Sequence, residues 1–169
     1  MRSRIMKRMF AGVTAAGVTA AGLAFLASGP AWAAIAPQPA SGTFLATSET
    51  VNSVYTAGGN TIVVVTVSGI STGTIDGPWT EIDRQVIHPD GTVTDQAHGM
   101  QSGTLGTCGT GSVRYVAGFL GNGSTATGRT QFIDQAASTS TPTKFHSVIR
   151  WTFNDITGEG TYTGSYHCT

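Results

Sequence analysis

Apolar and polar residues alternate with a period of two through most of the chain beyond residue 40. In 112–120 every second residue from Val113 to Phe119 is apolar, and 143–153 has largely the same spacing. This alternation is typical of strands with one buried face, because successive side chains point to opposite sides of a strand. The side chains predicted to face inward are Val113, Tyr115, Ala117 and Phe119 in the first segment and Phe145, Ile149, Trp151 and Phe153 in the second.

Eight such runs are separated by short segments rich in Gly, Asn, Asp and Pro. Pro89-Asp90-Gly91 predicts a hairpin, because Pro presets its own backbone angle and Gly accepts a positive φ. Antiparallel strands in this number protect their edges by closing into a barrel or by stacking as a sandwich. We expect an all-β fold with a single small antiparallel β-barrel of about eight strands, and the alternative is a β-sandwich. The predicted strands span 43–51, 61–75, 79–88, 92–101, 112–120, 127–134, 143–153 and 160–168.

The first 33 residues have the three parts of a secretion signal. Four basic residues lie among the first eight, an uncharged run follows at 11–28, and the small residues Ala31 and Ala33 fit a signal peptidase site. A membrane anchor is the alternative, because 18 uncharged residues approach a spanning length, but the run contains only two Leu. We therefore expect a secreted, extracellular protein without stable membrane insertion after cleavage. It would begin at Ala34, with a short leader at 34–40 and the barrel domain at 41–169.

Composition and charge narrow the possible fold classes and binding partners. Cleavage would leave 169 − 33 = 136 residues, enough for one domain, and 25 of them are Thr whereas only three are Leu. Thr suits strands and Leu suits helices, so the composition agrees with the alternation. The whole chain has no net charge, but the remaining part carries five basic and nine acidic residues, a net charge of −4. Nucleic acid is not an expected partner, because binding it requires a basic stripe.

Cys108 and Cys168 are the chain's two cysteines, and an even number in an oxidising compartment predicts one disulfide. The alternative is a pair of free thiols or metal ligands, for which only His167 is adjacent. The four histidines are scattered singly, so no metal site and no cofactor is predicted.

Two motifs suggest chemistry. Gly69-Ile70-Ser71-Thr72-Gly73 matches a Gly-x-Ser-x-Gly nucleophile elbow, but the helix that this motif needs does not follow. Glu81 and Asp83 share one strand face, and paired carboxylates can divide acid and base roles. Neither face of 79–88 is clearly apolar, so we expect a solvated face on which these carboxylates pair with cations of a neighbouring strand. No catalytic residue is assigned.

Four short segments carry a resemblance to a known family: GTF at 42–44, DGTV at 90–93, GTL at 103–105 and GEGTY at 158–162. With the predicted secretion and eight strands, they make residues 41–168 similar to the allene oxide cyclase barrel-like domains of actinobacteria, a largely uncharacterised family. The resemblance implies a barrel distantly akin to plant allene oxide cyclase and dirigent proteins, whose barrels hold an apolar guest and steer its cyclisation or coupling. No position matches their catalytic residues, so the resemblance implies no activity.

Three functions follow as hypotheses. The first is a non-catalytic module that binds a small apolar molecule inside the barrel, lined by Tyr115, Phe119 and Trp151. Tyr115 and Trp151 offer a polar tip as well as apolar area. The second is a fully packed extracellular structural or interaction barrel. The third is a cyclase-like or isomerase-like enzyme with Glu81 as its polar element. An eight-stranded barrel is wide enough to hold either its own side chains or one small ligand, and the sequence predicts no oligomeric state.

Overall fold

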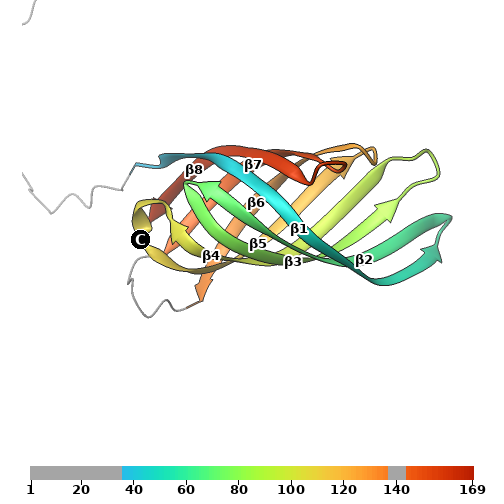
Figure 1. Cartoon of the computed structure of the whole chain (residues 1–169), viewed down its shortest axis with the longest axis horizontal. Helices are drawn as coiled ribbons and strands as arrows, with labels where there is room; N and C mark the ends of the chain where they lie inside the picture. The colour runs from blue at the N-terminus through green and yellow to red at the C-terminus, as the bar shows by residue number, and fades with distance from the viewer. Residues whose placement is uncertain (1–35, 137–143) are drawn as a thin grey trace, which may run out of the picture. The chain divides into compact units, whose positions relative to one another are not determined.

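The computed structural model describes residues 36–136 and 144–169, which form one closed barrel of eight antiparallel strands (Figure 1). Each strand pairs with the next along the chain, and β8 pairs with β1 to close the barrel. The all-β barrel is thereby confirmed over the sandwich. The predicted signal at 1–33 and residues 137–143 lie outside the described residues. The elements are β1 (Gln38–Ala57), β2 (Asn60–Gly73), β3 (Ile75–Ile87), β4 (Val93–Leu105), the 3₁₀ turn η1 (Gly106–Cys108), β5 (Thr110–Gly121), β6 (Thr125–Ala136), β7 (Phe145–Asn154) and β8 (Glu159–Cys168).

The strand boundaries differ from the predicted ones, and strand pairing and turn geometry explain two of the differences. β1 begins at Gln38, inside the predicted leader, because its first residues pair with the end of β8. The predicted strand 61–75 ends at Gly73, and Ile75 already belongs to β3. Gly73 has a φ of 111°, a conformation that favours glycine, so the chain reverses direction there within a single residue, Thr74.

One end of the barrel is closed by packed side chains. Leu105, Val113 and Phe145 are fully buried there, and Tyr166 stacks on Phe145 with ring centroids 5.5 Å apart. The Tyr166 hydroxyl donates to Gln38 Oε1 at 2.7 Å, which ties β8 to the start of β1. The hairpin turns that join β1 to β2, β3 to β4, β5 to β6 and β7 to β8 lie at the opposite end (Figure 1).

The predicted disulfide is confirmed: Cys108 and Cys168 are joined, with their Cα atoms 5.4 Å apart. The bond links the turn η1 to the last residue of β8, at the closed end of the barrel. This single covalent link closes a loop with a sequence separation of 60 residues. It therefore holds the C-terminal strand to the 3₁₀ turn that follows β4.

Inward aromatic rings lie over inward glycines on the neighbouring strand. Tyr115 is paired with Gly99, and a Cβ atom added at Gly99 would lie only 2.2 Å from Tyr115 Cζ. The missing side chain lets the ring lie close to the barrel wall, so the ring leaves the centre of the barrel less filled. The same arrangement recurs in the cross-strand pairs Gly42–Tyr162, Gly69–Trp79, Gly128–Trp151 and Gly160–Phe44.

Candidate functional site

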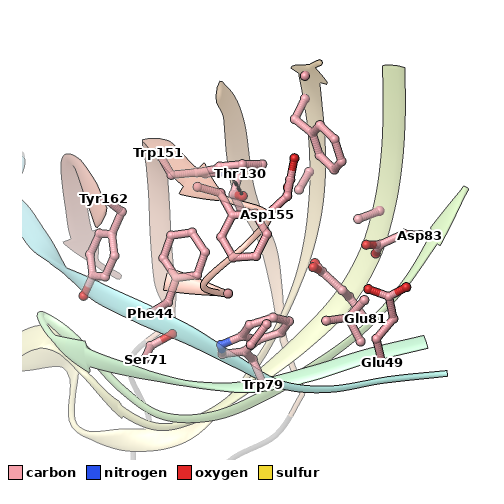
Figure 2. A pocket seen from close by; sticks show the side chains of 18 of the residues that line it. Phe44, Glu49, Ser71, Trp79, Glu81, Asp83, Thr130, Trp151, Asp155 and Tyr162 are labelled. Carbon is pink, nitrogen blue, oxygen red and sulfur yellow. Dashed lines mark hydrogen bonds between the residues drawn. The ribbon is translucent and has the colours of Figure 1, made fainter. Parts of the chain in front are cut away.

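The barrel lumen contains a cavity of about 620 Å³, large enough for a small organic molecule. Its wall consists of inward side chains from all eight strands, and Figure 2 shows part of it. Residues of the β5–β6 and β7–β8 turns also line it, so the cavity extends to the hairpin end of the barrel. The lumen is therefore not filled by the protein's own side chains.

Tyr115, Phe119 and Trp151, the three residues predicted to bind ligand, all line this cavity. Phe119 and Trp151 meet edge to face with ring centroids 5.5 Å apart. Other rings that were not predicted to bind ligand also line the cavity, among them Phe44 and Trp79. The ring centroid of Phe44 lies 6.0 Å from that of Trp151 and 6.4 Å from that of Trp79, so Phe44 joins the two indoles across the lumen. The alternation groups Trp79 with Glu81 and Asp83 but does not show which face of the strand points inward, so it could not assign Trp79 to the lumen.

Hydrogen bonds fix several polar groups of the wall. Trp151 Nε1 donates to Thr130 Oγ1 at 3.0 Å, and this bond orients the indole. Ser71 Oγ donates to Gln101 Oε1 at 3.2 Å. Ser71 is a buried residue of β2, and β2 is followed by β3 instead of the helix that a nucleophile elbow requires. Ser71 is therefore part of the cavity wall.

The prediction of a solvated face for Glu81 and Asp83 is wrong. Both side chains line the cavity, and Asp83 is only 4% exposed. Trp79 is buried on the same face of β3 as Glu81 and Asp83, whereas Ile82 on the other face is 55% exposed. The face that carries the two carboxyls therefore points into the barrel. Figure 2 shows Glu81 and Asp83 grouped with Glu49 at one side of the cavity. We call these three residues the luminal carboxyls.

The surroundings of Glu81, Asp83 and Asp95 raise the pKa values of these three carboxyl groups. Tyr115 donates a hydrogen bond to Glu81 Oε2 at 2.9 Å, but burial outweighs this bond and raises the pKa of Glu81 to about 7. Burial, with added repulsion from Glu81, Asp95 and Glu49, raises the pKa of Asp83 to about 9. Asp95, buried on β4, also has its pKa raised by burial, to about 6. The lumen therefore holds carboxyl groups that retain protons at a pH where exposed carboxyls have lost them.

In the described part of the chain, no three His, Cys, Asp or Glu side chains are grouped so as to hold a metal ion. His146 and His167 stack across β7 and β8 with ring centroids 5.0 Å apart, a contact between two histidines that are far apart in sequence.

The described residues also contain no helix that is long and apolar enough to cross a membrane.

Comparison of the chain with protein-family models and with curated proteins gave no match in either case.

Proposed function

We propose that this chain is a secreted barrel protein that binds one small, largely apolar molecule in its lumen and does not convert it. The observation that carries the proposal is the cavity of about 620 Å³, whose wall combines aromatic rings with a few polar groups. Ligand sites in proteins have this size and this mixture of surfaces. The glycine positions beneath the rings support the proposal further, because they keep the aromatic surface at the wall and leave space between the rings.

A second candidate function, a cyclase-like or isomerase-like enzyme, is favoured by one observation. Glu81 has its pKa raised to about 7 and accepts a hydrogen bond from Tyr115 inside the cavity, which are properties of a general acid or base. Conversion of a bound molecule by the purified protein, lost in Glu81→Gln, would favour the enzyme over the binding protein.

Filling the lumen is expected to abolish binding. Ala117 lines the cavity, so Ala117→Trp places an indole where the ligand would lie. With N-phenyl-1-naphthylamine, an uncharged dye that brightens in apolar surroundings, we expect saturable binding to the wild type and an affinity at least about tenfold lower in Ala117→Trp. Leu120→Trp is the matched control, because Leu120 lies on the same strand, outside the lumen, and is 61% exposed.

Circular dichroism shows whether each variant is folded, and Ala46→Trp, which fills the lumen from β1, provides a second variant. If the wild type gives no saturable signal with this dye or with a panel of terpenoids and phenolics, the proposed function is wrong.

The secretion proposed here is supported by the disulfide, which is consistent with an oxidising compartment outside the cytoplasm. We expect the protein recovered from the culture medium to begin at Ala34. N-terminal sequencing measures this directly, and a chain that begins at Met1 in a membrane fraction would show that residues 11–28 are an anchor.

A further inference from the structure

All the Asp, Glu, Lys, Arg and His side chains that line the cavity are acidic. Among the described residues that line the cavity, four are acidic and none is Lys, Arg or His. Arg84 and Arg150 are exposed on strands whose inward neighbours line the lumen, so their side chains lie on the outer surface. No positive charge of the wall therefore balances the luminal carboxyls. The fourth acidic residue, Asp155, lies in the β7–β8 turn.

A buried oxygen of Asp83 has no hydrogen-bond partner among the described residues. Asp83 Oδ1 is inaccessible to solvent and receives no hydrogen bond, although the residue is 4% exposed and lines the cavity. Leaving such an acceptor unsatisfied is unfavourable, and more so when the group is charged. The residue lines the cavity, so a cation bound beside its carboxyl would offset part of this cost through charge attraction.

The aromatic wall continues directly from the carboxyls. Trp79, Glu81 and Asp83 occupy successive inward positions of β3. Phe44 contacts both Trp79 and Trp151, so these rings continue the wall from the carboxyls across the lumen. Figure 2 shows the carboxyls at one side of the cavity and Phe44, Trp151 and Tyr162 at the other. Aromatic faces attract cations as well as apolar groups, and desolvation strengthens this attraction.

We infer that the ligand of this lumen is an organic monocation: a protonated amine on an apolar body, with the ammonium at Asp83 and Glu81 and the body between Trp79, Phe44 and Trp151. The inference rests on the proposed function and names the chemical class of its ligand. The ammonium lies against the Asp83 and Glu81 carboxyls, which line the cavity, and supplies the positive charge that the wall lacks. An anionic amphiphile such as a fatty acid would instead bring a further negative charge next to three carboxyls.

The protonation of Glu81 and Asp83 makes the binding of a cation depend on pH. Glu49 on β1, Asp95 on β4 and Tyr115 on β5 face Glu81 and Asp83, and none of these groups brings a positive charge. In the empty lumen Glu81 and Asp83 therefore retain protons above the usual carboxyl range, and a bound ammonium would favour the release of these protons. Binding of the ammonium should accordingly strengthen as the pH rises from about 5 to about 8.

The test uses three compounds with one apolar chain and three head groups: decylammonium, decanol and decanoate. Each competes with N-phenyl-1-naphthylamine on the full mature protein at pH 7. We expect decylammonium to displace the dye at a concentration at least about tenfold lower than decanol, because of one charge-assisted hydrogen bond and the cation–aromatic contact. Decanoate should be the weakest of the three. Calcium chloride, added at matched ionic strength, should not displace the dye.

Two variants test whether the preference for decylammonium over decanol depends on Asp83 and Glu81. Asp83→Asn and Glu81→Gln should each reduce the ratio of decylammonium to decanol affinity at least about threefold, whereas Glu159→Gln, on the exposed side of β8, should leave it unchanged. If decanol or decanoate competes as well as decylammonium while the dye still binds, the cation inference is wrong and the proposed function stands. Displacement by calcium, or an unchanged ratio in both variants, would also overturn the inference. If neither the dye nor any of the three compounds binds, both the cation inference and the proposed function are wrong.

Discussion

Asp83→Asn is expected to raise the free energy of unfolding by several kcal/mol near pH 8, with about 6 kcal/mol as the upper bound, and to leave it almost unchanged near pH 4. Burial raises the pKa of Asp83 from 3.8 to about 9, so between these values the folded chain keeps a proton that the unfolded chain releases. The folded state binds more protons, and the stability of the wild type therefore falls as the pH rises through this window. Asn does not ionise, so the variant avoids this loss.

Urea unfolding of the ligand-free protein at a series of pH values measures this difference. Glu159→Gln, which removes an exposed carboxyl on β8, is the control and should change the stability far less. Glu81 and Asp95, whose pKa values burial raises to about 7 and about 6, contribute a further decline with pH that remains in the variant. Parallel stability curves for wild type and Asp83→Asn would show that Asp83 ionises as an exposed aspartate does.

The same variant links stability to the proposed ligand. If Asp83 serves a cation, Asp83→Asn should be more stable when empty and should discriminate less well between an ammonium and an alcohol. A change that only disturbs folding would lower the stability and weaken all ligands together. The opposite signs of the two effects therefore separate a ligand-binding role of Asp83 from a general effect on the fold.

Removal of the disulfide is the second large effect expected. The double variant Cys108→Ala/Cys168→Ala should lose about 4 kcal/mol of stability, because the closed loop spans 60 residues and its opening increases the entropy of the unfolded chain. For a domain of this size the thermal midpoint should fall by about 10–20 °C. The link also holds β8, which closes the barrel against β1, to the turn η1.

Thermal unfolding followed by circular dichroism, with and without a reductant, provides the measurement. The reductant should lower the midpoint of the wild type and have no effect on the double variant, which has no disulfide to reduce. A midpoint shift below about 3 °C in the double variant would mean that packing at the closed end holds β8 without the covalent link.

The sequence by itself determined the eight strands, because the alternation of period two and the Gly-rich turns are local properties of the chain. It also determined the inward faces of β5 and β7, where Val113, Tyr115 and Phe145 are buried as predicted. The disulfide could be predicted because only two cysteines are present. The three predicted ligand residues line the cavity for the same reason, since they belong to the faces that the alternation marked as apolar.

Only the tertiary structure decided which face of β3 points inward. Both faces of this strand mix apolar and charged residues, so alternation groups Trp79 with Glu81 and Asp83 but does not orient the group. The orientation comes from pairing with β2 and β4, which places Trp79 over Gly69 inside the barrel and brings the carboxyls in with it. The open lumen also depends on cross-strand register, because an aromatic ring lies against the wall only where a glycine on the neighbouring strand is directly opposite. These are contacts between distant parts of the chain, and no local pattern specifies them.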